Sequence, residues 1–300
     1  MRPTLIKVHK IFVNIYSEHT LREINSYLKK GYGLRVDVGL SYNAPYLIRW
    51  VKTNKKIIVI GFEPHTQSFE NLKIKISHFP QEIRNRVFIF NCAISNVNSP
   101  TSQKFFSTGF PHTAIDPGRS SLLEPLGLLK DDVVEIFDVS VISLDYFLER
   151  INFRVIEFIK IDTQGNDLAV LKSLKSHISK VYMAQFERNC FDYYRKAATG
   201  SELDKFMIHN NFIQVWQTKT NSDSLFVNKS ITVLDFVPFR IDIMIRKFPI
   251  TLTKIIVKCP KIFLQTFLTS SFYVLNANMY KYYFKLKHYS KMLLQRIVRY

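Results

Sequence analysis

The feature that most constrains the fold is a regular alternation of short β-branched runs with helical stretches. Residues 34–38, 56–62 and 86–90 are rich in Val, Ile and Phe, and helical patterns at 44–52 and 67–77 separate them. Strands that alternate with helices in this order build a parallel sheet with right-handed crossovers. The sequence therefore predicts an α/β fold, in which helices flank a mostly parallel central sheet.

The alternation resumes after residues 95–133, whose several Pro and Gly residues predict a long irregular excursion. Further strands are predicted at 134–142, 155–161, 180–187, 212–217 and 224–228, with helices at 144–150, 167–176 and 202–209. Asp167 is expected to be the N-cap of the second of these helices. We expect an N-terminal helical segment at 1–33, one α/β domain at 34–230 and a basic C-terminal extension at 231–300.

Positive charge is concentrated near the end of the chain. Residues 229–300 hold 13 of the 42 Lys and Arg residues but only 2 of the 24 Asp and Glu residues. Such a segment can meet nucleic acid, anionic lipid or an acidic substrate, or can simply aid solubility. Residues 262–280 lack charges, but their polar side chains make insertion into a bilayer costly. The three Cys residues form no CxxC pair, so we expect no disulfide framework, no metal site and a cytoplasmic setting.

Acidic residues stand at the ends of three predicted strands. Asp37 precedes Gly39 after the first strand, Glu63 and then Pro64 follow the second, and Asp162 ends a later one. Carboxyl ends of parallel strands share one edge of the sheet, where ligands bind. A carboxylate in the position of Glu63 can accept hydrogen bonds from both ribose hydroxyls of an adenosine cofactor. Asp37 could bind a ligand ammonium, orient its loop or cap the next helix, and Asp162 could bind cofactor or acceptor or act as a general base.

These segments together resemble the FkbM family of methyltransferases. The resemblance runs from about residue 36 to residue 228 and rests on DVGLSYNAP, VIGFEP, NCAIS, SSLLEP, VISLDYFL and, most specifically, IKIDTQGNDLAVLKSL. It implies a Rossmann-like class I methyltransferase fold and S-adenosyl-L-methionine as the cofactor. It also implies that a methyl group is transferred to an oxygen of a natural product, a sugar or a glycolipid.

The resemblance assigns roles to individual positions. It makes Asp37 and Gly39 residues of the cofactor loop and Glu63 the ribose ligand. The residues expected near the adenine are those after the third strand, namely Asn91, Cys92 and Ala93. Asn43 stands where the class motif commonly has another Gly, and we expect the loop to form nevertheless because Asn tolerates left-handed geometry.

Three residues are candidates for the general base of the reaction. The resemblance places Asp162 and Glu187 over the reaction crevice, and His112 lies in the Pro- and Gly-rich loop. We expect residues 95–133 to form a lid over the acceptor. The predicted function is O-methylation of a sugar, glycolipid or other small-molecule hydroxyl.

Two alternatives from other functional classes stay open. One is a catalytically silent binding module that retains the fold, which Asn43 and the unusual extension suggest. The other is an adaptor for a membrane surface or nucleic acid, driven by the basic residues and Tyr side chains after position 230. We expect an anionic membrane surface rather than nucleic acid, because a glycolipid acceptor would connect the two halves of the chain.

Overall fold

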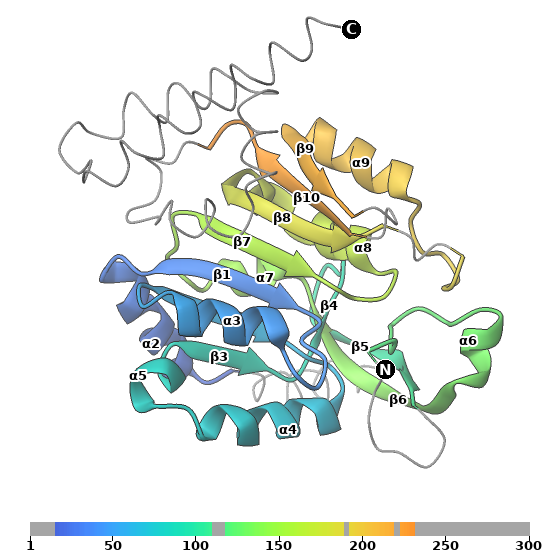
Figure 1. Cartoon of the computed structure of the whole chain (residues 1–300), viewed down its shortest axis with the longest axis horizontal. Coiled ribbons are helices and arrows are strands. Elements are labelled where there is room, and N and C mark those ends of the chain that lie inside the picture. The colour runs from blue at the N-terminus through green and yellow to red at the C-terminus, as the bar shows by residue number, and fades with distance from the viewer. Residues whose placement is uncertain (1–15, 110–117, 189–191, 219–222, 232–300) are drawn as a thin grey trace, which may run out of the picture.

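The computed structural model describes residues 16–109, 118–188, 192–218 and 223–231. Within these residues a seven-stranded sheet has the order β3-β2-β1-β7-β8-β10-β9 (Figure 1). Its strands are β1 (Gly33–Val38), β2 (Ile57–Phe62), β3 (Val87–Phe90), β7 (Ile156–Ile161), β8 (Val181–Glu187), β9 (Phe212–Gln217) and β10 (Asp223–Asn228). All neighbouring pairs are parallel except β8–β10 and β10–β9. The predicted Rossmann-like α/β fold with a mostly parallel sheet is confirmed.

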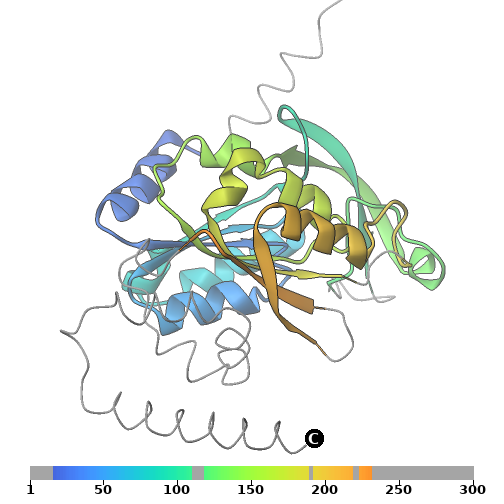
Figure 2. The ribbon, with the colours of Figure 1, turned by 90° about the horizontal axis from the view of Figure 1, so that it is seen from above.

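Helices cover both faces of this sheet, as Figure 2 shows. One face carries α3 (Pro45–Thr53), α4 (Thr66–Ser77) and α5 (Gln81–Arg84). The other carries α2 (Glu18–Lys29), α7 (Leu144–Leu148), α8 (Asp167–Lys172) and α9 (Gly200–His209), with the 3₁₀ helix η1 (Lys175–Lys180) after α8. None of the helices in the described ranges is long and apolar enough to span a membrane. The predicted basic extension lies outside the described residues apart from its first residue.

The continuous apolar runs of the strands follow from this three-layer arrangement. Ile58 and Ile60 of β2 pack into the core under α2, α7 and α8, whereas Ile57 and Val59 pack under α3. Successive strand side chains point to opposite faces, so a strand covered on both sides is apolar at most positions, and the charged Arg35 and Glu157 of β1 and β7 are buried as an ion pair. Burying each of these side chains contributes about 1.5–3 kcal/mol. The core therefore holds the carboxyl ends of β1, β2 and β7 in one register.

A second, three-stranded sheet lies beside the first, with the order β4-β6-β5. It contains β4 (Ala93–Ile94), β5 (Thr101–Thr108) and β6 (Val133–Ile142), and the short helix α6 (Leu128–Asp131) precedes β6. The prediction that residues 95–133 are wholly irregular is therefore wrong. The pattern TSQKFFST of β5 shows little apolar periodicity, and the strand is formed by pairing with distant residues, such as Phe105 with Phe137.

The start of α8 also differs from the prediction. Asn166 is its N-cap residue, and Asp167 is the first helical residue. The Asp167 carboxylate accepts a hydrogen bond from the backbone N–H of Gly165 at 3.2 Å, so it closes the preceding turn instead of capping the helix. The turn geometry decides this, because Gln164 and Gly165 both have positive φ angles.

Candidate active site

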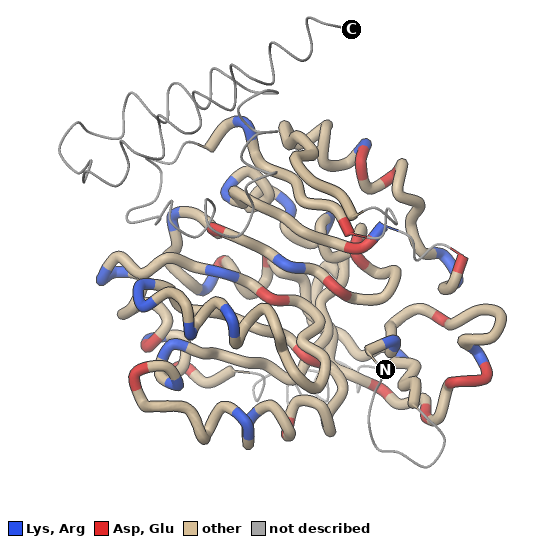
Figure 3. The backbone as a smooth tube through the Cα atoms, viewed as in Figure 1, with Lys and Arg blue, Asp and Glu red and all other residues tan. Residues whose placement is uncertain are grey.

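A cleft of about 220 Å³ lies at the carboxyl ends of β1, β2 and β7. Strand order reverses between β1 and β7, and open α/β sheets bind ligands at such a point. The carboxylates of Asp37, Glu63 and Asp162 all line this cleft. Figure 3 shows acidic segments of the described chain gathered at this edge of the sheet. The structure thus brings together the three acidic residues that end strands in the sequence.

Gly39 lets two backbone segments meet at the floor of the cleft. Its φ is +83°, and a Cβ added there would lie 1.9 Å from the carbonyl oxygen of Asp162. The Gly39 N–H donates to the Phe62 carbonyl at 3.0 Å, and the Asp162 N–H donates to the Val38 carbonyl at 2.9 Å. The sequence suggested a ligand as the reason for this glycine. The structure adds a nearer reason, which is contact with the loop after β7.

Asp37 caps a helix from within the sheet. Its Oδ2 accepts a hydrogen bond from the Leu47 N–H in the first turn of α3 at 2.9 Å. The residue at the N-cap position, Ala44, has no side-chain oxygen to do this. Asp37 is 2% exposed, and burial raises the pKa of its carboxyl to about 7. Of the roles left open by the sequence, the structure therefore shows the capping role.

The loop between β1 and α3 contains two residues other than glycine in the left-handed conformation. Ser41 and Ala44 have φ angles of 54° and 41°, whereas Asn43 is absent from the described residues with positive φ. The loop thus forms with Asn43 in place of glycine, and it does not use the left-handed tolerance of Asn at this position. Asn43 lines the cleft, and its carbonyl accepts a hydrogen bond from the Lys75 ammonium at 3.3 Å.

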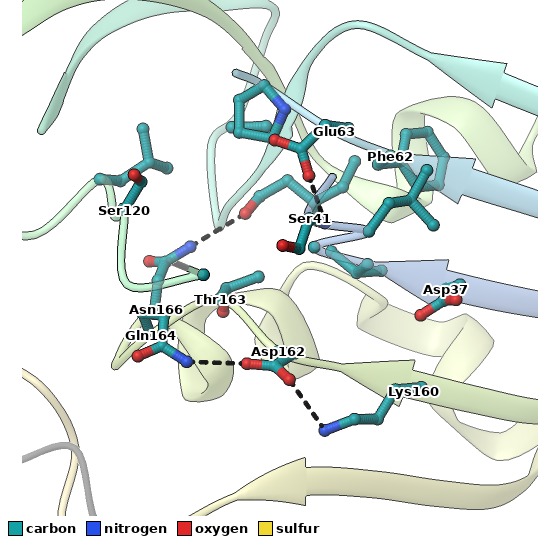
Figure 4. A pocket seen from close by; sticks show the side chains of 18 of the residues that line it. Asp37, Ser41, Phe62, Glu63, Ser120, Lys160, Asp162, Thr163, Gln164 and Asn166 are labelled. Carbon is teal, nitrogen blue, oxygen red and sulfur yellow. Dashed lines mark hydrogen bonds and ion pairs between the residues drawn. The ribbon is translucent and has the colours of Figure 1, made fainter. Parts of the chain in front are cut away.

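Glu63 organises the opposite wall of the cleft. Its Oε2 accepts from the Ser41 N–H at 2.7 Å, and its Oε1 accepts from the His65 N–H at 2.9 Å. Figure 4 shows the Glu63 carboxylate directed at Ser41, and Pro64 also lines the cleft. The side-chain amide of Asn91 donates to the carbonyls of Glu63 and Pro64 at 2.9 and 3.2 Å. This network joins the loops after β1, β2 and β3.

The residues predicted near the adenine divide into two groups. Cys92 and Ala93 line the cleft, together with the aromatic ring of Phe62. Asn91 is absent from the lining and supports the Glu63 turn from behind. The Cys92 thiol is fully buried, and burial raises its pKa. Its contribution to the cleft is thus an apolar surface.

A buried lysine faces Asp162 across the end of β7. The Lys160 ammonium lies 3.5 Å from Asp162 Oδ2 and 3.3 Å from Asp223 Oδ1, and it donates to the Ile161 carbonyl at 3.1 Å. Burial alone would lower the pKa of Lys160, but the carboxylates of Asp162 and Asp223 outweigh it and raise that pKa. The sequence reasoning missed Lys160. Its spacing of two from Asp162, which puts both on one face of an extended chain, was the available signal.

The other two candidates for the general base are Glu187 and His112. Glu187, at the end of β8, does not line the cleft but accepts a hydrogen bond from the Gln164 amide at 3.1 Å. The same amide nitrogen donates to Asp162 at 2.8 Å. His112 lies outside the described residues. Gln164 was another residue that sequence reasoning missed, because its partner Glu187 lies on a different strand.

The second sheet and the segment after residue 117 form a further wall. Phe105 of β5, Ser120 and Leu122 line the cleft. The Ser121 hydroxyl donates to the carbonyl of Gln164 at 2.8 Å, which ties this wall to the loop after β7. Within the described ranges no group of three or more His, Cys, Asp or Glu residues could hold a metal ion.

Comparison with known families decides the identity of this fold and cleft. The profile of the family described as "Methyltransferase FkbM domain" matches residues 16–213. The chain belongs to the FkbM methyltransferase family. The match covers β1, β2, β7 and β8, and therefore the whole edge of the sheet at which the cleft of this FkbM domain lies.

Solved methyltransferases resemble this FkbM domain at low sequence identity. A methyltransferase FkbM from Methylobacillus flagellatus is 14% identical with a TM-score of 0.43, over 66% of this chain and 44% of that one. This chain thus corresponds to less than half of that protein. M. capricolum TrmK, solved with S-adenosyl-homocysteine, is 11% identical with a TM-score of 0.37, over 94% of this chain and 98% of that one. Comparison with curated proteins found no match.

Proposed function

We propose that this FkbM-family protein uses S-adenosyl-L-methionine to methylate a hydroxyl oxygen of a sugar, glycolipid or other small molecule. The observation that supports the proposal most is the position of Glu63, which lines the cleft at the end of β2 beside the loop of Gly39. A carboxylate in this place suits the ribose diol of an adenosine cofactor. The loop after β1 is then left to hold the amino-acid portion of that cofactor.

The polar groups of the cleft are able to take such a ligand. Each carboxylate oxygen of Glu63 accepts a backbone hydrogen bond, and the two oxygens of a carboxylate are the acceptor geometry that a diol requires. Among the described residues, the buried Thr163 Oγ1 on the cleft has no hydrogen-bond partner, as expected where a ligand supplies one. The cleft of about 220 Å³ is smaller than most ligand sites, so parts of the cofactor and acceptor would extend beyond it.

The chemistry required of the protein is modest. The bound cofactor supplies an electrophilic methyl group on a sulfonium. The chain must align the acceptor oxygen, keep water out and take up a proton. Asp162 suits the last task, because it lines the cleft and 41% of its side chain is exposed. Phe105 and Leu122, which both belong to the predicted lid, provide an apolar wall.

Calorimetric titration with S-adenosyl-homocysteine tests the cofactor site. We expect the wild-type chain to bind, and Glu63→Ala to bind at least about tenfold more weakly, since it loses hydrogen bonds to a charged group. Glu70→Ala is the matched control, because Glu70 lies exposed on α4, where it pairs with Lys73. Thermal unfolding checks each variant, since Glu63 also holds the loop of Ser41. A folded wild-type chain that does not bind would contradict the proposal and favour the silent binding module.

We also propose that residues 231–300 attach the domain to an anionic membrane surface, where a glycolipid acceptor would lie. The support is the sequence, in which the basic surplus of the chain gathers after residue 228. Lys and Arg near an anionic leaflet each contribute about 1 kcal/mol to binding. The protein would then be cytoplasmic and peripheral to a membrane.

A further inference from the structure

One side-chain amide connects the two carboxylates considered for proton uptake. Gln164 Nε2 donates to Asp162 Oδ1 at 2.8 Å and to Glu187 Oε2 at 3.1 Å. Figure 4 shows the Gln164 side chain directed at Asp162, with Lys160 on the far side of that carboxylate. A primary amide nitrogen carries two hydrogens and can therefore serve both acids. Gln164 thus connects Asp162, which lines the cleft, to Glu187, which is not part of its lining.

The two carboxylates determine the orientation of this amide. The amide oxygen Oε1 lies 3.2 Å from the hydroxyl of Tyr194, which also lies 2.7 Å from the Arg119 carbonyl. Tyr194 is 1% exposed, so its ring has little freedom. A reversed amide would turn its oxygen toward two carboxylates, which are acceptors only when ionised. The nitrogen therefore faces the acids.

The backbone at this position is held as firmly as the side chain. Gln164 has a φ of 53°, which is uncommon for a residue other than glycine. Its carbonyl accepts from the Ser121 hydroxyl at 2.8 Å. A Cβ on Gly165 would lie 2.9 Å from Ala197 Cβ and 3.2 Å from Tyr194 Cβ, so the loop packs directly against the segment that carries Tyr194. These contacts place the amide where both carboxylates can reach it.

We propose that Gln164 is a positioning residue for methyl transfer, whose amide keeps Asp162 and Glu187 as separate ionised carboxylates and aims Asp162 at the acceptor hydroxyl. The inference rests on the proposed function. A neighbouring negative charge favours the protonated form of a carboxyl, and donated hydrogen bonds oppose this by favouring the ionised form. A protonated Asp162 would be unable to accept a proton from an alcohol.

Several other titratable groups lie near Asp162 and Glu187 and also influence their charge. They come from β7, α8, β1, β10 and α3, and are Lys160, Asp167, Asp37, Asp223 and Tyr46. Asp167 is 2% exposed, and burial followed by the charge of Asp162 raises its pKa to about 7. The Lys160 ammonium forms ion pairs with both Asp162 and Asp223. Hydrogen bonds from Gln164 act together with the Lys160 ammonium to favour the ionised form of Asp162.

Titration of ¹³C-labelled carboxyl groups by NMR tests this on the full chain and needs no acceptor. Resonances are assigned with Asp162→Asn and Glu187→Gln. Gln164→Met keeps the length of the side chain and removes both donors, so the proton affinity of at least one of the two acids should rise about tenfold. Gln164→Glu should raise it further, because it adds a third carboxylate. Unchanged titration of both acids in Gln164→Met overturns the proposal.

Controls separate this result from folding and from cofactor binding. Gln67→Met is matched, since Gln67 lies exposed on α4 and its amide contacts Asn71; it should leave both titrations unchanged. If Gln164→Met does not fold, Tyr194→Phe is titrated in its place. The proton affinity of the acids should then rise by less than in Gln164→Met, and an unchanged proton affinity overturns the proposal. Binding of S-adenosyl-homocysteine is measured separately. Its failure in the wild type would sink the proposed function while the carboxyl titration still reports on Gln164.

Discussion

Replacing Gly39 with Ala should destabilise the protein for two separable reasons. The φ of +83° is left-handed, and the new Cβ would lie 1.9 Å from the Asp162 carbonyl oxygen. The left-handed conformation costs an Ala residue about 1–2 kcal/mol. Forcing an atom into occupied space costs about 1–3 kcal/mol. The free energy of unfolding of Gly39→Ala should therefore fall by about 2–5 kcal/mol.

Gly31→Ala isolates the first of these costs. Gly31 has a φ of +75°, and a Cβ there would meet no heavy atom within 4 Å. It should lose only about 1–2 kcal/mol. Urea denaturation followed by circular dichroism measures both variants. Titration with S-adenosyl-homocysteine should show wild-type affinity for Gly31→Ala and weaker binding for Gly39→Ala. Equal destabilisation of the two would refute the argument that contact with Asp162 requires glycine at position 39.

Two further predictions concern charge. Burial raises the pKa of Asp37 to about 7, from an ordinary value of 3.8, so the folded state keeps a proton that the unfolded chain releases. The free energy of unfolding should therefore fall as pH rises from about 4 to about 7. Urea denaturation of Asp37→Asn should show a fall that is smaller by an amount on the order of 2 kcal/mol. A pH profile identical to that of the wild type would contradict this. The full chain should float with phosphatidylserine vesicles but not with phosphatidylcholine alone, and high salt should release it. Flotation with neither lipid would count against a membrane role.

The main sheet was predictable because its signals are local. The strands β1, β2 and β7 are covered on both faces, so apolar residues dominate each of them; the buried exceptions are Arg35, Asp37, Glu157 and Lys160. Strand β5 was not predictable in the same way, because the first half of its sequence, TSQK, is polar and at least partly exposed. It exists because β6, farther along the chain, pairs with it. Pairing between distant segments has no signature within either segment alone.

Within the site, the sequence located acids but could not define their partners. Asp37, Glu63 and Asp162 were found because each stands at a strand end, and strand ends share an edge. Lys160 and Gln164 were missed, since their importance comes from Asp223 and Glu187 on other strands. The left-handed residues of the first loop, Ser41 and Ala44, were not predicted for a similar reason, because contacts beyond the loop help to set its backbone.

By itself, the sequence determined the order of the elements, the mostly parallel sheet and the edge at which the acids gather. Apolar periodicity and turn residues act over a few positions, so they can be read in place. Only the tertiary structure decided that Asp37 caps α3, that Glu63 holds the turn at Ser41 and that Gln164 joins two carboxylates. A buried polar group must find a hydrogen-bond partner, and in this fold those partners lie on segments that only packing brings together.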